Sequence, residues 1–531
     1  MRNQRYPLYE HSDIASIADL LEQEAAKWPD RTAFRFRVKK GQTESRSRQD
    51  VLQDTLRAAC RISGILSQGK HVAIIGENTY AWLIAFFAVL SSGNVAVPVD
   101  KDLPAAEIAG MLRQADVSAV LVSDTYADVV EGIGGLTVLP LKQPSAQEEI
   151  PAGFSLAHPE PDDLACIFFT SGTSGQSKGV MLTHGNLASE ISLGARMVDM
   201  EDGTVFSVLP YHHTFGLTVS VLIPYHLHAP IYICSSLKRL REDLLLARPR
   251  ILPVVPLFVE VMHKQISEGI RKQGKERAFS AAVRLSRFLL ALGIDLRRKL
   301  FRTILSQFGG ELRCIFCGGA YLDPAYITVF RDLGVEILNA FGATECSPGI
   351  AINRNHYHRD GSVGLMLPDV EAKISPEGEV LIKGPIVMKG YYHQPEETAR
   401  VLRDGWYATG DLGRLDQDGF LFLTGRMKNL IILSNGENIS PEELENDLRR
   451  DPGVRDALVY EADRAIAAEI YPAEEFMGNE AYFRELKQKI NEGRPAYKQI
   501  SRISLRDQDF IRNTSKKIVR YKNIPGKEGS L

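Results

Sequence analysis

A decapeptide at residues 170–179, with the sequence TSGTSGQSKG, combines glycines, hydroxyls and a lysine in a pattern that can hold an anion. The glycines Gly172, Gly175 and Gly179 let the backbone turn so that successive N–H groups point at one negatively charged group. Lys178 adds a mobile positive charge, and the hydroxyl groups add donors. The hydroxyl-bearing residues are Thr170, Ser171, Thr173, Ser174 and Ser177. The segment therefore predicts an anion-binding loop.

This loop differs from the Walker P-loop, in which the lysine directly follows the second glycine of GxxxxGK[ST]. A flexible Gly/Ser linker is the alternative interpretation. A linker does not require a buried strand before it, yet the apolar run CIFF at residues 166–169 immediately precedes the loop, and VMLTHGNL at 180–187 follows it. These flanking segments favour anion binding over a linker.

Cys314 and Cys317 form a CxxC pattern within ELRCIFCGGA, an apolar run that ends in glycines. A redox or zinc role requires a helix N-terminus after the first cysteine, or a second pair of ligands. Neither is evident in the sequence, so we interpret the segment as a buried strand. Six cysteines in 531 residues do not suggest a disulfide framework, and we expect a reducing, cytoplasmic compartment.

Short apolar runs alternate with helical patterns over the first part of the chain. HVAIIGEN (71–78) and NVAVPVD (94–100) predict buried strands, and AWLIAFFAVL (81–90) predicts a buried helix between them. PAAEIAGMLRQAD (104–116) has apolar residues three and four apart, as in an amphipathic helix, and VSAVLVSD (117–124) predicts another strand. This β-α-β-α-β order implies parallel sheets with helices on their faces.

The pattern changes after about Asp369. VEAKISPEGEVLIKGP (370–385) and GRLDQDGFLFLTGR (413–426) predict β-hairpins. Beyond them the chain has its own alternation of helices and strands, so we predict an N-terminal domain at 1–427 and a C-terminal domain at 428–531. The stretch GIRKQGKERAFSAAVRLSRF (269–288) is basic and helical, and we interpret it as a solvated helix face.

Length and composition exclude several classes of protein. A chain of 531 residues exceeds what one hydrophobic core usually supports. A net charge of -3 does not predict binding to nucleic acid or to an anionic membrane, and peripheral membrane contact stays open. The longest apolar run is shorter than the about 20 residues that cross a bilayer, and the first residues lack the apolar core of a signal peptide. We expect a soluble protein without a transmembrane segment or a nucleic-acid partner.

The loop resembles the signature of the adenylate-forming superfamily, which contains acyl-CoA synthetases, aryl-CoA ligases, beetle luciferases and peptide-synthetase adenylation domains. Six further segments resemble the other motifs of that family, in the family's order. They are LPYHHTFGL (209–217), NAFGATE (339–345), GEVLIKGPIVMKGYY (378–392), WYATGDLG (406–413), GRMKNLIILSNGENISPEELE (425–445) and RNTSKKIVR (512–520). The resemblance implies an α/β fold, with a large N-terminal domain of mixed, mostly parallel sheets flanked by helices, a β-rich subdomain, and a small α+β C-terminal domain on a hinge.

The resemblance also implies that the chain binds ATP and Mg2+. The loop residues would hold the β- and γ-phosphates, with Lys178 at its end. Glu345 would bind Mg2+ and Thr344 would contact the α-phosphate, while Asp411 would accept from the ribose hydroxyls and Arg426 would give a second contact. Gly318, Gly319 and Ala320 are implied to lie against adenine, with Phe341 stacking on it, and Asn339, Ala340 and Gly342 are also implied to bind the nucleotide. Phe341 replaces the family's tyrosine and keeps its stacking face.

Three further roles follow from the resemblance. Lys517 would bridge the carboxylate and α-phosphate oxygens, although Lys516 replaces the family's preceding glycine and the terminal proline is missing. His213 would lie near the mouth of the acyl tunnel, and its neighbour His212 leaves open which of the two faces the substrate. Lys428 falls at the hinge about which the small domain turns between half-reactions.

The implied reaction joins a carboxylic acid to AMP, releases pyrophosphate and then transfers the acyl group to a thiol. The segment 209–224 carries no carboxylate for a substrate amine, and its apolar residues favour a medium- or long-chain fatty acid. Coenzyme A is the expected acceptor, while an acyl carrier protein with a phosphopantetheine arm stays open, as does an aryl acid as substrate. Two other classes remain as alternatives: a luciferase-type oxygenase and a non-catalytic nucleotide-binding homologue.

Overall fold

In the computed structural model, residues 7–39, 41–170, 177–200, 203–432, 438–462, 465–512 and 518–525 are described. They form two compact units. The first comprises the chain up to Ala372 together with Ile382–Tyr407 and Gly419–Leu421. The second comprises Lys373–Leu381, Ala408–Asp418 and the chain from Phe422 onward.

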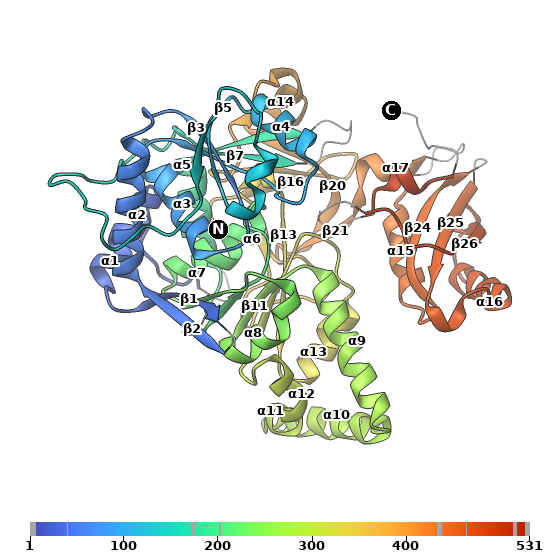
Figure 1. The fold of residues 1–531 in the computed structure, drawn as a ribbon. Helices are drawn as coiled ribbons and strands as arrows, with labels where there is room; N and C mark the ends of the chain where they lie inside the picture. The colour runs from blue at the N-terminus through green and yellow to red at the C-terminus, as the bar shows by residue number, and fades with distance from the viewer. Residues whose placement is uncertain are drawn as a thin grey trace. The chain divides into compact units, whose positions relative to one another are not determined.

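Two large sheets form the framework of the first unit (Figure 1). The first has the order β15 (Leu365–Met366), β14 (Gly349–Ile352), β13 (Glu336–Gly342), β12 (Cys314–Cys317), β11 (Ile251–Val254), β9 (Val205–Ser207), β10 (Ile231–Ile233), β1 (Thr32–Lys39) and β2 (Gln42–Ser47). The second has the order β18 (Gly390–Tyr391), β8 (Lys178–Thr183), β7 (Leu164–Thr170), β4 (Val95–Pro98), β3 (His71–Ile75), β5 (Val117–Val122) and β6 (Thr137–Pro140). The inner pairs of both sheets are parallel and the pairs at one or both ends are antiparallel. The predicted mixed, mostly parallel α/β fold is thus confirmed.

Helices cover these sheets. They are α1 (Ile17–Lys27), α2 (Arg48–Ser63), α3 (Tyr80–Ser91), α4 (Ala105–Gln114), α5 (His184–Ala195), α6 (Thr214–Leu217), α7 (Ile223–His226), α8 (Leu240–Ala247), α9 (Pro256–Lys272), α10 (Glu276–Ala291), α11 (Arg297–Leu300), α12 (Arg302–Leu305), α13 (Pro324–Asp332) and α14 (Pro395–Val401). Every residue of α3 is buried, as predicted for AWLIAFFAVL, because the helix packs on β3 and β4 and is covered by α1 and α2. No helix among the described residues is long and apolar enough to cross a membrane.

A five-stranded sheet contains the predicted hairpins. Its strands are β16 (Glu371–Ile374), β17 (Glu379–Lys383), β20 (Trp406–Leu415) and β19 (Leu402–Arg403), in that order, with β21 (Leu421–Arg426) paired to β20. Both predicted hairpins are confirmed, because β16 neighbours β17 and β20 pairs with β21. The turn between β20 and β21 falls at residues 416–419.

From β22 onward, the second unit is an α+β structure. The strands β24 (Val454–Ala462), β25 (Ala465–Pro472) and β26 (Ile500–Leu505) form a sheet, with β24 antiparallel and β26 parallel to β25. The other elements are β22 (Ile431–Ile432), β23 (Asn438–Ile439), α15 (Pro441–Arg449), α16 (Glu480–Asn491) and α17 (Arg520–Asn523). An apolar core drawn from α15, α16 and the sheet, including Leu444, Leu448, Ile470 and Phe483, holds this part together.

Candidate active site

The signature loop connects two antiparallel strands. The buried strand β7 ends at Thr170, which pairs with Lys178 at the start of β8. The residues at the two ends of the loop, Thr170 and Lys178, are therefore fixed by the hairpin of β7 and β8 in the seven-stranded sheet. The predicted phosphate-binding residues Ser171, Gly172, Thr173, Ser174 and Gly175 lie outside the described residues.

Lys178 lies in a small cluster of polar side chains at the base of this hairpin. Its Nζ is 2.6 Å from Oε2 of Glu397 on α14 and 4.9 Å from the centre of the Tyr391 ring. Tyr391 reaches this position because β18 pairs with β8, placing Tyr391 opposite Val180. The lysine is thus held beside the hairpin base by one carboxylate and one aromatic face.

Tyr391 also connects Lys178 to Glu345. The Tyr391 hydroxyl donates to Oε1 of Glu345 at 2.8 Å, and the backbone N–H of Met388 donates to the Glu345 carbonyl at 2.8 Å. Burial and the adjacent carboxylate raise the pKa of Tyr391, so its hydroxyl keeps the proton that it donates. Glu345 is itself half-buried within the short helical turn Thr344–Cys346, which connects β13 to β14.

Helix α5 supports the segment that carries Thr344 and Glu345. Asn186 completes a capping box with Thr183 at the N-terminus of α5, and its Nδ2 donates to the carbonyl of Pro385 at 2.7 Å. One turn later, Oε1 of Glu190 accepts from the backbone N–H of Gly349 at 3.0 Å. Glu190 is fully buried, and burial raises its pKa well above the ordinary value. Its other oxygen has no hydrogen-bond partner among the described residues.

The predicted nucleotide-binding residues of 318–320 and 339–342 gather at the carboxyl ends of two neighbouring parallel strands. Cys317, the last residue of β12, pairs with Asn339 on β13, so Gly318–Ala320 and Asn339–Gly342 emerge side by side. Gly318 lies against the Phe215 ring, and a Cβ atom there would come within 3.0 Å of it. The carboxyl ends of parallel strands are where open α/β sheets bind ligands.

Asn339 provides an unused acceptor at this edge. Its side chain is buried, and its Oδ1 has no hydrogen-bond partner in the described part of the chain. A buried amide oxygen without a partner costs free energy unless a donor reaches it. Phe341, two residues along the same strand, is also buried. The edge therefore offers an aromatic side chain and an amide oxygen that lacks a donor.

The two neighbouring histidines take different positions. His212 has its Nε2 3.5 Å from Oδ2 of Asp100, and burial lowers its pKa. His213 is the residue preceding α6, and its carbonyl accepts from the N–H of Leu217 at 3.1 Å. The rings of the two histidines lie 4.4 Å apart. The contact with Asp100 gives His212 a structural partner.

In the second unit, Asp411 and Arg426 form an ion pair across the hairpin of β20 and β21. The Arg426 Nε lies 2.7 Å from Oδ1 of Asp411. Asp411 is buried, and its backbone N–H donates to the Thr409 hydroxyl at 3.1 Å. Arg426 is half-exposed and is followed by the short helical turn Met427–Asn429 that contains Lys428. The family resemblance implied that both residues contact ATP, and in the structure their side chains form an ion pair.

The terminal motif is closed by contacts on both sides of the predicted lysine. Residues 513–517, which include Lys517, lie outside the described residues. Arg512 and Ile518 form an antiparallel bridge, and Asn523 donates from Nδ2 to the carbonyls of Ile511 at 2.9 Å and Val519 at 2.8 Å. The residues on either side of 513–517 are therefore held close to one another.

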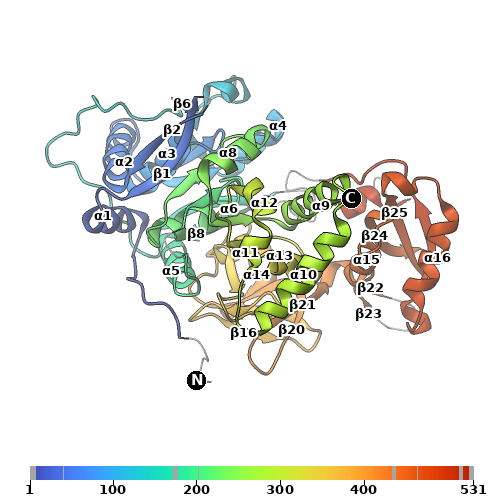
Figure 2. The same ribbon diagram turned by 90° about the horizontal axis from the view of Figure 1, so that it is seen from below.

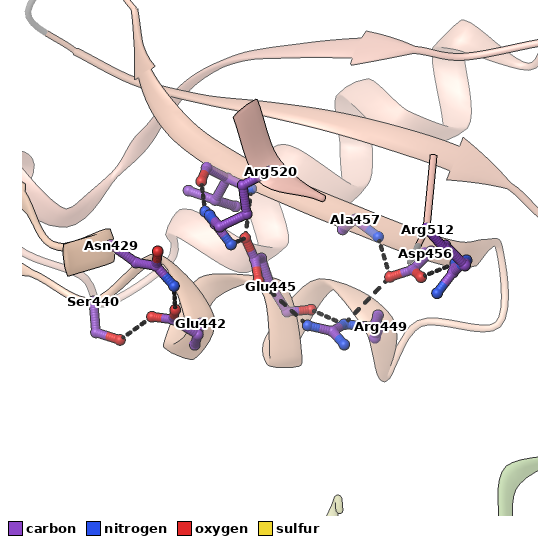
Figure 3. Close-up of polar contacts among 10 residues, drawn as sticks. Asn429, Ser440, Glu442, Glu445, Arg449, Asp456, Ala457, Arg512 and Arg520 are labelled. Atoms are coloured by element: carbon purple, nitrogen blue, oxygen red, sulfur yellow. Dashed lines mark hydrogen bonds and ion pairs between the residues drawn. The ribbon is translucent and has the colours of Figure 1, made fainter. Parts of the chain in front are cut away.

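Two ion pairs attach these flanking residues to α15 and β24 (Figure 3). Arg520 pairs with Glu445 at 2.6 Å, and Arg512 pairs with Asp456 at 2.5 Å. Glu445 is fully buried and also accepts from the N–H of Val459 at 2.8 Å. Burial raises the pKa of Glu445, while Arg520 and Arg449 oppose that rise. The residues that flank the Lys517 segment are thus anchored by Arg512 and Arg520, which pair with buried or partly buried carboxylates.

Comparisons with known proteins agree with this arrangement. A family model described as AMP-binding enzyme matches residues 21–392, and one described as AMP-binding enzyme C-terminal domain matches residues 428–523. The chain belongs to the AMP-binding enzyme family. The long-chain-fatty-acid–CoA ligase FadD15 of Mycobacterium bovis is 30% identical over 427 residues, covering 74% of this AMP-binding enzyme and 71% of that protein. The rat long-chain-fatty-acid–CoA ligase 5 is 29% identical over 448 residues, covering 74% and 65%.

Solved structures show the same fold. The ATP-bound RpMatB–BxBclM chimera B1 superposes with a TM-score of 0.78 at 26% identity, covering 96% of this chain and 99% of that one. The anthranilate CoA ligase AuaEII in complex with anthranoyl-AMP superposes with a TM-score of 0.77 at 21% identity, covering 98% of each chain. The AMP-binding enzyme described here is an acid–thiol ligase of the AMP-forming, acyl-CoA synthetase type.

Two residues of the site were not assigned a role from the sequence. Tyr391 and Glu397 contact Lys178, and Tyr391 also contacts Glu345. Tyr391 lies within the motif GEVLIKGPIVMKGYY, and its place in that motif could have indicated a role in the site. Glu397 follows that motif in an ordinary helical sequence, and only the pairing of β18 with β8 and the packing of α14 bring it close.

Proposed function

We propose that this AMP-binding enzyme activates a medium- or long-chain fatty acid with ATP and transfers the acyl group to coenzyme A. The observation that carries the proposal is the cluster of Lys178, Tyr391 and Glu345 at the base of the signature hairpin. It brings a cation for phosphate oxygens next to a carboxylate suited to Mg2+. The relatives named as long-chain-fatty-acid–CoA ligases support the choice of acid.

The residues fit ATP and Mg2+ on chemical grounds. Asn339 Oδ1, which lacks a donor, suits the amino group of adenine, and Phe341 supplies a stacking face beside Gly318–Ala320. The described residues contain no cluster of three or more acidic, histidine or cysteine side chains that could hold a metal. This suits Mg2+, which proteins commonly bind through one or two carboxylates plus substrate phosphates and water. Glu345 is the carboxylate that we assign to it, and bound Mg2+ would neutralise phosphate charge.

The first half-reaction needs positioning more than a protein nucleophile. A carboxylate oxygen of the acid attacks the α-phosphorus of ATP, and pyrophosphate leaves. In our assignment the loop from Thr170 to Lys178 holds the β- and γ-phosphates, while Thr344 and Lys517 contact the α-phosphate. Asp411 accepts from the ribose hydroxyls, with Arg426 holding its carboxylate in place. His213 lies at the entrance of the acyl site.

The second half-reaction requires a thiol to reach the acyl carbonyl as AMP leaves. We assign Lys428 as the hinge at which the C-terminal domain, residues 428–531, turns relative to residues 1–427. The turn would withdraw the Lys517 loop and admit the thiol. Coenzyme A is the acceptor we propose. A carrier-protein phosphopantetheine presents the same thiol, and the structural similarity to an anthranilate CoA ligase keeps an aryl acid as the second candidate substrate.

Thioester formation tests the acid and the acceptor together. The enzyme is incubated with ATP, Mg2+ and a panel of straight-chain fatty acids of graded length plus benzoate and anthranilate, with either coenzyme A or a phosphopantetheinylated carrier protein. We expect the highest kcat/KM with a medium- or long-chain acid and coenzyme A. A maximum with an aryl acid would overturn the proposed substrate, and carrier loading without acyl-CoA formation would overturn the proposed acceptor.

A further inference from the structure

The basic segment 269–288 forms parts of two helices rather than one. Helix α9 ends at Lys272 and α10 begins at Glu276, with Gln273–Lys275 between them. Figure 1 shows α9 leading into α10 at the lower edge of the first unit, and Figure 2 shows the same two helices from below. The sequence interpretation of a solvated helix face is incomplete, because α10 exposes apolar side chains as well as charges.

One face of α10 is anchored in the fold. Phe279, Ala282 and Val283 pack against the core formed by α8, α9, α13 and the nine-stranded sheet, and Ser286 is buried. Arg287 pairs with Asp332 of α13, with Nη2 2.6 Å from Oδ2. The helix therefore has a fixed orientation and a defined outer face.

The outer face carries a continuous apolar stripe. Leu285, Phe288 and Leu292 are 51%, 63% and 61% exposed, and their spacing of i, i+3 and i+7 places them on one side of the helix. Ile294, beyond the C-terminal end of α10, is also exposed, at 48%. A cluster of large apolar side chains at one helix end is uncommon on a surface that meets only water.

The same region concentrates positive charge. Residues 264–302 contain eleven Lys and Arg against three Asp and Glu, a formal charge of +8 in a chain whose total is -3. Arg277 and Arg284 are exposed, and within the described parts of the chain they form no hydrogen bond or ion pair. With Phe288 they are spaced i, i+7 and i+11, so both arginines border the apolar stripe. Lys272, Lys299 and Arg302 are further exposed cations.

We propose that the outer face of α10, with the flanking cations, docks on an anionic lipid bilayer. Leu285, Phe288 and Leu292 enter the boundary between headgroups and acyl chains, while Arg277 and Arg284 contact lipid phosphates. A second copy of the chain fits less well, because a two-fold contact would bring two surfaces of the same charge together. The proposal does not depend on which acid or thiol the enzyme uses.

Vesicle flotation tests the docking surface. The full-length enzyme is mixed with phosphatidylcholine vesicles, with or without phosphatidylglycerol, at low and high salt. We expect flotation with the anionic vesicles that weakens as salt rises. The Arg277→Gln, Arg284→Gln variant should bind less tightly, by about fivefold for each cation removed, and the Leu285→Ser, Phe288→Ser, Leu292→Ser variant should lose most of its binding.

Matched control variants distinguish binding through α10 from nonspecific binding of exposed side chains to vesicles. Ile65 and Val138 are 48% and 53% exposed outside this region, so the Ile65→Ser, Val138→Ser variant should float like the wild type. Lys70→Gln with Lys142→Gln is the corresponding control for charge, because both lysines are exposed. Thermal unfolding and ATP–pyrophosphate exchange, measured on every variant, identify any that have lost the fold.

The flotation results distinguish membrane docking from self-association of the chain. Failure of the wild type to float with anionic vesicles, or equal flotation of the α10 variants and their controls, would overturn the proposal. A dimer that the triple serine variant converts to monomer, without vesicle binding by the wild type, would instead assign the stripe to a second copy. If the α10 variants lose vesicle binding as expected but the enzyme synthesises no acyl-CoA, the docking proposal would stand and the proposed function would be wrong.

Discussion

Tyr391 connects two residues of opposite charge that the motifs place far apart in the sequence. Its ring faces Lys178 and its hydroxyl donates to Glu345. Because this hydroxyl orients the carboxylate that we assign to Mg2+, we expect Tyr391→Phe to raise the half-saturating Mg2+ concentration for ATP–pyrophosphate exchange roughly tenfold, the size of one hydrogen bond to a charged group.

The neighbouring tyrosine offers a matched control for this prediction. The Tyr392 hydroxyl donates to Asp116 at 2.9 Å, outside the Lys178–Tyr391–Glu345 cluster. Tyr392→Phe should therefore leave the Mg2+ dependence unchanged. If Tyr391→Phe and Tyr392→Phe gave the same Mg2+ titration as the wild type, Glu345 would not depend on Tyr391 for its orientation.

Glu190 predicts a specific dependence of stability on pH. Burial raises its pKa above the ordinary value of 4.5, so the folded state keeps the proton that the unfolded state releases. The unfolded state then binds fewer protons, and the free energy of unfolding falls as pH rises above that ordinary value. Glu190→Gln removes this titration while keeping the acceptor for the Gly349 N–H.

Urea unfolding across that pH range measures the effect. The stability of Glu190→Gln relative to the wild type should increase from acid to neutral pH, whereas Glu107→Gln, on the exposed side of α4, should show no such trend. A pH-independent difference between Glu190→Gln and the wild type would mean that Glu190 is ionised in the folded protein.

At the scale of elements, the residues on either side of Lys517 are paired to α15 and β24. Arg520 pairs with the buried Glu445, and Glu445→Gln weakens that pair without changing side-chain volume. If the pair positions the Lys517 loop, Glu445→Gln should slow acyl-adenylate formation about tenfold or more and leave thioester formation from supplied acyl-adenylate unchanged. Single-turnover assays of each half-reaction measure the two steps separately.

Glu443 is the control on the same helix. It is exposed and pairs with Lys498 at 3.1 Å, so Glu443→Gln should alter neither step. Equal losses in both half-reactions for Glu445→Gln would indicate general destabilisation of the second unit in place of a positioning role.

Local patterns predicted the elements that adjoin the site. The apolar runs before the signature loop and at Cys314–Cys317 are strands, and the hairpin of β20 and β21 forms where its turn residues indicated. Each depends on periodicity or turn chemistry within a few residues. The sequence also indicated which residues share a motif, and through the family resemblance it indicated the AMP-binding fold.

Long-range pairing could not be read in this way. The strand β18 has two residues, Gly390 and Tyr391, and its partner β8 lies more than two hundred residues earlier in the chain. Nothing in the local pattern specifies that register, so the contacts of Lys178 with Tyr391 and Glu397 emerged only in three dimensions. The exposed stripe of α10 was missed for a related reason, because an apolar residue in a basic helix can face either the core or the solvent.

At the scale of the whole molecule, the two half-reactions make different demands on the C-terminal part. We assign the change between them to rotation at Lys428, within the turn Met427–Asn429. Proline at this position fixes φ near one value and restricts the residue before it. We expect Lys428→Pro to retain ATP–pyrophosphate exchange and to reduce thioester formation by an order of magnitude or more.

Lys428→Ala separates rotation from charge, because alanine removes the ammonium group and leaves the backbone free. It should keep both half-reactions near the wild-type rate. Loss of adenylation in Lys428→Pro, or loss of thioester formation in Lys428→Ala, would contradict the hinge assignment.

The central claim is that the enzyme forms an acyl-adenylate from ATP and a carboxylic acid, and ATP–pyrophosphate exchange in the absence of any thiol measures that step directly. Across a panel of acids of graded chain length, we predict Mg2+-dependent exchange with a maximum at a medium- or long-chain fatty acid and strong suppression in Lys517→Ala. Absence of exchange with every acid tested would contradict the account.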